Sequence, residues 1–260
     1  MIYLKTDEEI ELIRESSLLV GKTLAEVAKE IKPGVRIDKL DHIAEEFIRD
    51  SGAVPGFKGY NGFPATLCIS INEQVVHGIP GNRILKDGDI ASIDCGTILN
   101  GFYGDSAYTF AVGNVRDEVL QLMKRTKESL YKGIEKAVIG SRVGDIGYAV
   151  QKYVEEAGYS VVRDLVGHGL GKQLHEKPEI PNYGRRGTGT KLKEGLVICI
   201  EPMINLGTHR VIQEKDGWTI RTADSLHSAH YEHAVAVRKN QADILSSFKD
   251  IEEVLNMKIS

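Results

Sequence analysis

Cysteine is scarce in this sequence. Its three cysteines, Cys68, Cys95 and Cys199, are far apart, and no two have the CxxC spacing. A zinc ribbon and a thioredoxin-like motif are therefore excluded. An odd number of scattered thiols gives no disulfide framework, and the sequence has no Asn-x-Ser/Thr glycosylation site. We therefore expect a reducing, cytoplasmic compartment.

Long apolar runs and an excess of basic residues are also missing. The first 15 residues contain no long apolar run, so we expect neither a signal peptide nor a membrane span. Lys and Arg number 33 against 37 Asp and Glu, a balance that does not favour a nucleic-acid partner. With 42% apolar and 27% charged residues over 260 positions, the chain has the composition of an ordinary globular protein. We expect a single domain that spans residues 1–260 and is large enough for an enzyme.

The hydrophobic pattern predicts helices interspersed with strands. Thr6 and Glu9 form a capping box at the start of a helix that Pro33 and Gly34 end. Asn100-Gly101 predicts a two-residue hairpin turn between strands at 90–94 and 103–112. The other predicted elements are helices at about 38–50, 116–137, 143–157 and 243–257, strands at 66–71 and 196–201, a Gly/His loop at 166–171, and a final hairpin with arms at 217–222 and 232–238.

The two halves of the chain, about 10–113 and 116–240, resemble each other weakly. At offsets of 106 and 107 residues, a Gly-x-Arg start and an apolar strand ending in an acid recur, and each half also contains a His-Gly pair. The matched pairs are Gly34 with Gly140, Asp94 with Glu201, Asp105 with Glu232, and His77 with His168. Each half thus offers one histidine and two carboxylates. A pseudo-two-fold axis would bring both sets to one centre.

Two carboxylates stand where strands should be apolar. Asp94 ends the run Ile-Ala-Ser-Ile, and Glu201 ends Val-Ile-Cys-Ile. A buried carboxylate costs several kcal/mol unless it is paired, hydrogen-bonded or bound to metal. The Asn100-Gly101 turn pairs Asp94 with Ala107, so Asp94 and Asp105 become diagonal neighbours on one face and repel each other without a cation.

Carboxylates combined with histidine and no thiolate cluster suit Mn, Fe, Co or Zn. Two such ions bridged by carboxylates and water form the arrangement of two-metal hydrolases. His175-Glu-Lys-Pro is not an HExxH motif, and Gly167-His-Gly-Leu-Gly171 is not a dinucleotide fingerprint. The remaining histidines are interpreted as structural: His42, His209, His227, His230 and His233.

Taken together, these motifs resemble the methionine aminopeptidase family, in its short bacterial type I form, over nearly the whole chain. The strings that carry the resemblance are Val-Val-His77-Gly-Ile-Pro, Ser-Ile-Asp94-Cys-Gly, Tyr-Gly-Asp105-Ser-Ala, Gly-His168-Gly-Leu-Gly, Leu-His175-Glu-Lys-Pro, Ile-Glu201-Pro-Met and His-Tyr-Glu232-His-Ala. The resemblance implies an α+β, pita-bread fold, in which a pseudo-two-fold antiparallel sheet is flanked by helices. It also implies removal of N-terminal methionine, preferentially before a small second residue.

The resemblance further implies a dinuclear metal site with five ligands. Asp105 and Glu232 would bridge two divalent ions, Asp94 would hold one of them, and His168 and Glu201 the other. Glu201 would also shuttle a proton from water to the leaving amide nitrogen. His77 and His175 would contact the peptide and the tetrahedral intermediate.

Substrate choice would come from an apolar slot lined by Tyr60, Phe63, Cys68 and Trp218. Phe57 and Leu174 depart from the residues common in the family at their positions and affect the width of this slot. The implied partners are N-termini of peptides and nascent chains, with transient ribosome association. We expect a monomer.

Two alternatives stay open at this point. Aminopeptidase P and prolidase share the fold and the ligand types, but they carry an N-terminal domain for which Asp94 comes too early in this chain. A pita-bread binding module without catalysis is the second alternative. Such proteins typically lose ligands, whereas all five are present here, and failure to bind metal would favour it.

Overall fold

The helices follow from their caps and apolar faces. The computed structural model describes residues 1–259. Glu9 N donates to Thr6 Oγ1 and Thr6 N donates to Glu9 Oε2, both at 3.2 Å, which confirms the predicted capping box. The first helix ends shortly before Pro33, as expected. The helices are α1 (Asp7–Glu30), α2 (Ile37–Asp50), the 3₁₀ helix η1 (Tyr60–Gly62), α3 (Asp117–Ile134), α4 (Val143–Glu155) and α5 (Lys249–Ile259).

The longest strands form one hairpin around the predicted turn. Asn100 and Gly101 have φ values of 53° and 80°, the left-handed conformations that this turn requires. The register pairs Asp94 with Ala107 and Gly96 with Asp105, as predicted. The strands are β1 (Val54–Pro55), β2 (Leu67–Ile71), β3 (Gln74–Val76), β4 (Ile90–Leu99), β5 (Phe102–Ala111), β6 (Ser160–Val161), β7 (Gly167–Gly169), β8 (Glu176–Ile180), β9 (Val197–Ile200), β10 (Met203–Asn205), β11 (Val211–Gln213), β12 (Ile220–Thr222), β13 (Ser228–His230), β14 (His233–Ala236) and β15 (Asp243–Ile244).

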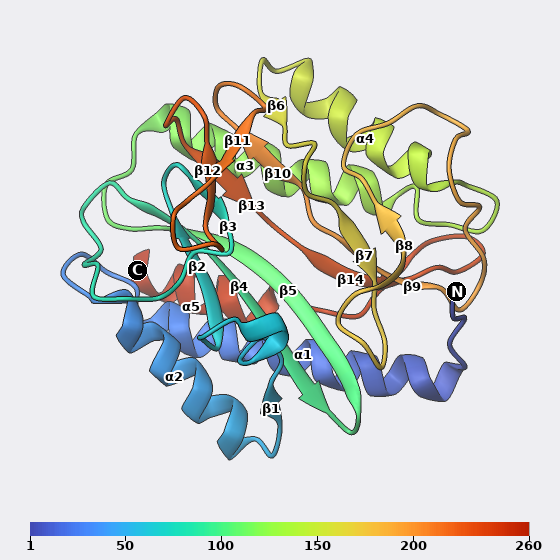
Figure 1. Cartoon of the computed structure of the whole chain (residues 1–260), viewed down its shortest axis with the longest axis horizontal. Coiled ribbons are helices and arrows are strands. Elements are labelled where there is room, and N and C mark those ends of the chain that lie inside the picture. The colour runs from blue at the N-terminus through green and yellow to red at the C-terminus, as the bar shows by residue number, and fades with distance from the viewer. Residues whose placement is uncertain (260) are drawn as a thin grey trace.

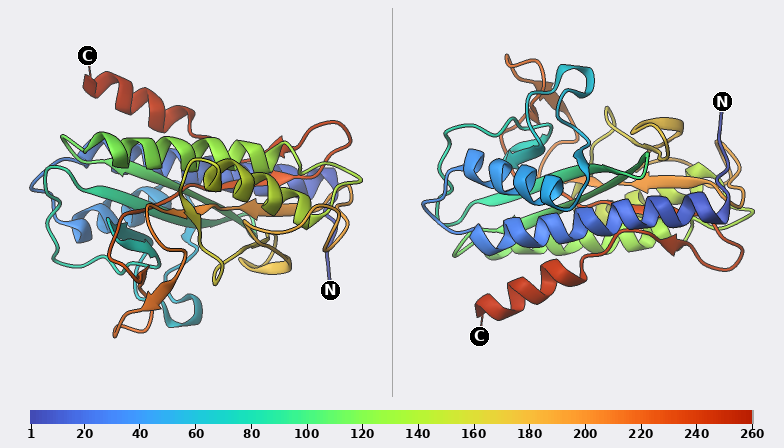
Figure 2. Two further views of the ribbon diagram at one scale, coloured as in Figure 1. Left: turned by 90° about the horizontal axis from the view of Figure 1, so that it is seen from above. Right: turned by 90° about the horizontal axis from the view of Figure 1, so that it is seen from below.

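Two larger antiparallel sheets, one from each half, lie side by side (Figure 1). The first contains β1, β4 and β2, with β5 on β4, and the second runs β15-β14-β9-β7-β8. They meet where Glu232 N donates to Ala107 O at 3.0 Å and Ser106 Oγ donates to Glu232 O at 2.7 Å. Figure 2 shows α1, α3 and α4 covering one face, with α5 outside them. The other face carries loops, η1 and the β11–β12 hairpin, and this is where a site can form.

The core separates into a large cluster between helices and sheets and a smaller one under the open face. Phe110, Ile93 and Ile198 belong to the large cluster. Phe57, Cys68 and Cys199 belong to the smaller one. None of the helices within residues 1–259 is both long enough and apolar enough to cross a membrane.

Four local predictions were wrong. The strand predicted at 90–94 continues to Leu99, so Asp94 lies inside β4 rather than at its end. The predicted final hairpin does not form, because β12 pairs with β11 and β3 whereas β14 pairs with β9 and β15. Residues 243–244 form β15, so the last helix begins only at Lys249. The Gly/His loop contains the short strand β7, because a glycine at 167 allows close approach to β9: a Cβ there would lie 2.3 Å from Cys199 O.

Candidate metal centre

The first half of the chain contributes two carboxylates from the β4–β5 hairpin. Asp94 and Asp105 share one face of the ladder, and an oxygen of each, Oδ1, is buried without a hydrogen-bond partner among the described residues. Burial raises the pKa of Asp94 to about 7. Burial, then the charges of Glu232 and Asp94, raise the pKa of Asp105 well above its usual range. A cation is the partner that such oxygens lack.

The second half contributes Glu201, directly after β9, and Glu232, directly before β14. The register that pairs Ile200 with His233 places these two glutamates next to each other beyond the strand ends. Glu232 is 2% exposed, and its Oε1 has no hydrogen-bond partner within residues 1–259. The pKa values of both glutamates are raised well above normal, mainly by burial and also by neighbouring carboxylates.

His168 stands between the two sets of carboxylates, at an irregular position of β7. Its Nδ1 lies 3.0 Å from Gly169 O, so Nδ1 carries the proton and Nε2 keeps a free lone pair. Nε2 is 3.7 Å from Asp105 Oδ2 and 3.6 Å from Glu201 Oε1. These separations are too long for hydrogen bonds but fit atoms that share a cation through bonds of about 2.0–2.2 Å. Burial lowers the pKa of His168 to about 3, which keeps the ring neutral.

Ligand atoms of Asp105, His168, Glu232 and Cys199 all lie within 4.8 Å of one another. Three of these residues belong to the predicted ligand set, and Asp94 and Glu201 line the same cavity. Cys199 was not predicted as part of the site. Strand alternation could have found it, because Val197, Cys199 and Glu201 share one face of the chain. Oxygen and imidazole donors in this number fit divalent ions such as Mn, Fe, Co or Zn.

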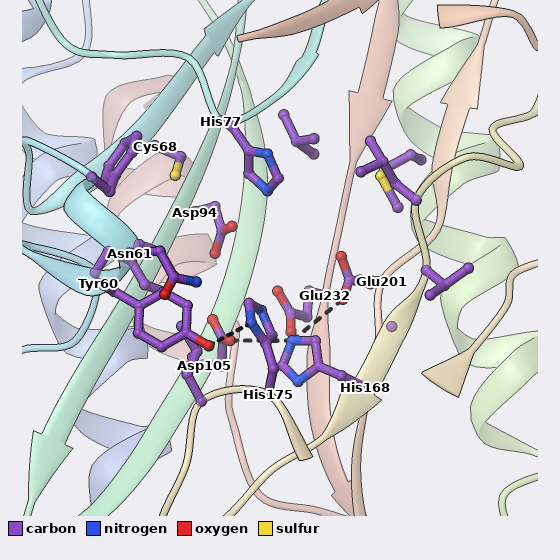
Figure 3. A pocket seen from close by; sticks show the side chains of 18 of the residues that line it. Tyr60, Asn61, Cys68, His77, Asp94, Asp105, His168, His175, Glu201 and Glu232 are labelled. Carbon is purple, nitrogen blue, oxygen red and sulfur yellow. Dashed lines mark hydrogen bonds and ion pairs between the residues drawn. The ribbon is translucent and has the colours of Figure 1, made fainter. Parts of the chain in front are cut away.

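A cavity of about 540 Å³ opens above these ligands (Figure 3). All the site residues predicted from the sequence line it: Tyr60, Phe63, Cys68, His77, Asp94, Asp105, His168, His175, Glu201, Trp218 and Glu232. The fold therefore brings all the predicted site residues together around one cavity. Phe57 and Leu174 line the cavity too and are almost fully buried.

His77 and His175 face the cavity from opposite halves of the chain (Figure 3). His77 has a φ of 58°, a strained conformation held because the next residue, Gly78, packs on β2. Burial and the nearby His175 lower the pKa of His77 to about 4. His175 Nδ1 lies 2.9 Å from the Tyr60 hydroxyl, and burial lowers its pKa as well. Both imidazoles are therefore neutral near pH 7.

Aromatic rings form the side of the cavity away from the ligands. Phe63 and Trp218 meet edge to face, with ring centroids 5.1 Å apart. Phe57 packs on Gly96, where an added Cβ would lie 2.5 Å from its ring. The pair of β4 and β5 that presents Asp105 therefore also fixes Phe57, so slot and ligands are built on one scaffold.

A buried ion pair that the sequence did not suggest supports the loop carrying His175. Lys5 pairs with Glu176, and their side chains are 5% and 6% exposed. Lys5 N also donates to Gly195 O at 2.7 Å. The N-terminal arm thus joins the loops on either side of it. No sequence signal links two charges so far apart in the chain.

This site and the two-part sheet that carries it define a metallopeptidase. The chain matches the sequence model of metallopeptidase family M24 over residues 11–239 and belongs to that family. It is 53% identical to a methionine aminopeptidase of Clostridium acetobutylicum, over 95% of this chain and 99% of that protein. It is 50% identical to methionine aminopeptidase 1 of Bacillus subtilis, over 95% and 99% of the two chains. Within the family it therefore belongs with the bacterial type I methionine aminopeptidases.

Solved structures agree. The crystal structure of methionine aminopeptidase from Rickettsia prowazekii matches with a TM-score of 0.94 and 43% identity, over 95% of this chain and all of that one. Prolidase from Pyrococcus furiosus matches with a TM-score of 0.76 and 25% identity, over 94% of this chain but only 65% of that one. These neighbours confirm the α+β, pita-bread fold expected from the sequence.

Proposed function

We propose that this protein removes the N-terminal methionine from peptides and nascent proteins, preferentially when the second residue is small. The observation that carries the proposal is one cavity in which buried carboxylates and His168 lie beside an aromatic slot. The names of relatives at 50–53% identity support the same activity.

Five residues would hold two divalent ions: Asp94, Asp105, His168, Glu201 and Glu232. Asp105 and Glu232 would bridge both ions, Asp94 would hold one, and His168 with Glu201 the other. The unpartnered oxygens of Asp94, Asp105 and Glu232 support this assignment, because each needs a positive partner. When bound, such ions supply Lewis acidity and a water whose pKa is near neutral.

Proton transfer falls to Glu201. Its side chain lines the cavity, so it can accept a proton from the attacking water and deliver it to the leaving amide nitrogen. His77 and His175, both neutral, hold the peptide oxygens as negative charge develops on them. The Tyr60 hydroxyl, donating to Nδ1 of His175, leaves the proton of that ring on Nε2 for the substrate.

Specificity comes from the slot formed by Tyr60, Phe63, Cys68 and Trp218. Aromatic faces attract a thioether by about 0.3–1.5 kcal/mol per contact. Phe57 and Leu174, which also line the cavity, limit the width and the rim of the slot. The free α-amine of the substrate, held at the metal centre, restricts cleavage to the first peptide bond.

The same proposal covers the organisation of the chain. Residues 1–260 act as one catalytic domain whose halves, 10–113 and 116–240, each supply part of the site. Support comes from the hydrogen bonds between Glu232 and the 106–107 segment, which tie the halves together at the ligands. We further propose a cytoplasmic monomer that meets nascent chains at the ribosome.

The test is an assay of the purified, metal-stripped protein on Met-Ala-Ser and Ala-Pro-Ser, with Mn, Fe, Co or Zn returned in turn. Metal-dependent release of methionine, with Ala-Pro-Ser intact, is expected. Release of alanine would instead indicate a proline-specific peptidase. Activity on neither peptide, with metal bound, would indicate a binding module.

A further inference from the structure

His230 is a buried histidine directly behind the metal centre, and the proposed reaction gives it no role. It ends β13 and is 1% exposed. Thr109, on the strand that carries Asp105, fixes its backbone in both directions: His230 N donates to Thr109 Oγ1 at 3.0 Å, and Thr109 Oγ1 donates to His230 O at 2.7 Å. The position of the ring is therefore tied to the same scaffold as the ligands.

Glu201 lies between two imidazoles, with one carboxylate oxygen facing each. Oε1 is 3.6 Å from His168 Nε2, and Oε2 is 3.7 Å from His230 Nε2. The side chains of Glu201 and His230 are 13% and 1% exposed, so little water screens the second contact. Within residues 1–259, no other proposed ligand lies within ion-pair distance of two histidines.

The two histidines are not equivalent. His168 lines the cavity and has its Nδ1 proton occupied by Gly169 O, which leaves Nε2 as a lone pair for an ion. His230 does not belong to the cavity lining, and its Nε2 is buried without a hydrogen-bond partner within residues 1–259. A lone pair at Nε2 would face a carboxylate oxygen, which is repulsive, whereas an N–H there would satisfy both buried groups.

We propose that His230 is a positioning residue: its Nε2–H donates to Oε2 of Glu201 and turns Oε1 toward His168 and the metal centre. This inference rests on the proposed function of Glu201 as ligand and proton shuttle. The proposal requires this contact, 3.7 Å in the structure, to shorten to hydrogen-bond length, which a small rotation of either side chain achieves. A ligating carboxylate with such an outer partner keeps one orientation through metal binding and proton transfer.

Two variants of His230 distinguish the loss of the hydrogen-bond donor from the loss of side-chain packing. His230→Gln keeps an N–H donor, whereas His230→Leu fills the space without one. His42→Gln, on the exposed face of α2, serves as the control. In calorimetric titrations with Mn²⁺, we expect His230→Leu to weaken binding by about 10–100-fold, the range measured for lost outer partners. His230→Gln and His42→Gln should stay within a few-fold of wild type. Equal weakening by Gln and Leu, or none by Leu, would overturn the proposal.

A second measurement uses the wild-type protein, so it does not depend on the folding of a variant. In the zinc-loaded protein labelled with ¹⁵N-histidine, we expect His230 to carry its proton on Nε2 and His168 to carry it on Nδ1. A proton on Nδ1 of His230 would overturn the proposal. Both readouts are independent of peptidase activity, so a protein inactive on methionyl peptides would refute the proposed function without deciding the role of His230.

Discussion

The two halves hold their carboxylates in different ways. Asp94 and Asp105 are short side chains inside one continuous hairpin, and the register of the ladder places them on one face. Glu201 and Glu232 are longer, and each lies one residue outside its strand. In the second half, both glutamates lie beside other side chains: His168 and His230 face Glu201, and a ligand atom of Cys199 lies within 4.8 Å of one of Glu232. The proposed proton shuttle therefore comes from the second half, beyond a strand end, whereas the carboxylates of the first half lie within a hairpin.

The strongest test of this difference is to remove the side chain of Glu201, the proposed proton shuttle. Glu201→Ala should stay folded, because the residue lies outside β9, yet lose methionine release by about 10²–10⁴-fold or more, since it removes both a ligand and the proton shuttle. Peptide turnover and far-ultraviolet circular dichroism measure the two effects. Turnover like that of wild type would remove the mechanism.

The support beneath His175 can be broken from the N-terminal arm. Lys5→Met leaves Glu176 buried and unpaired, so the free energy of unfolding should fall by about 3–5 kcal/mol. Lys172→Met is the matched control, because Lys172 pairs with Glu9 at the surface and its loss should cost at most about 1 kcal/mol. Urea unfolding measures both. Similar losses would show that the buried pair is not a clamp.

The assignment of ligands to two ions predicts an unequal loss. His168→Ala should weaken binding of one ion more than the other, by about 10–100-fold or more, because in the proposed assignment His168 holds only the ion that it shares with Glu201. A two-site metal titration resolves the affinities. Equal weakening at both sites would contradict the partition between the halves.

The last prediction is a pH dependence of the stability of the metal-free protein. The folded state raises the pKa of Asp94 to about 7, so between about pH 4 and 7 the folded state binds more protons than the unfolded state. Stability should therefore fall as pH rises through this window, by up to about 1.4 kcal/mol per pH unit for each such carboxyl. Saturating Mn²⁺ should remove the slope. Thermal unfolding with and without Mn²⁺ checks this, and a flat profile without metal would speak against a strained acidic cluster.

The contrast between the halves also explains what the sequence could predict. The β4–β5 register followed from one turn, since Asn100-Gly101 fixes every pair along the hairpin. The arms at 217–222 and 232–238 were assigned to each other wrongly, because their partners β3 and β9 come from distant parts of the chain. The alternation of apolar and polar residues along a strand indicates which side chains share a face, but it does not indicate which strand pairs with it.

The same limit applies to the site. Asp94 and Glu201 could be predicted because a charge that follows an apolar run is conspicuous, although Asp94 proves to lie inside β4. His230 was interpreted as structural, and Lys5 drew no attention, because their roles depend on side chains that only the fold brings near. The local sequence was enough to predict the ligands. The residues that hold those ligands in position could not be predicted, because they come near only in the folded chain.

The central claim is that carboxylates from both halves together form one dinuclear metal centre. The most direct measurement is the number of Mn²⁺ ions bound per chain, in wild type and in the Asp105→Ala/Glu232→Ala double variant. We predict two ions in the wild type and loss of both in the double variant, because it removes a bridge from each half. A single ion in the wild type, or two ions retained without the bridging residues, would contradict the account.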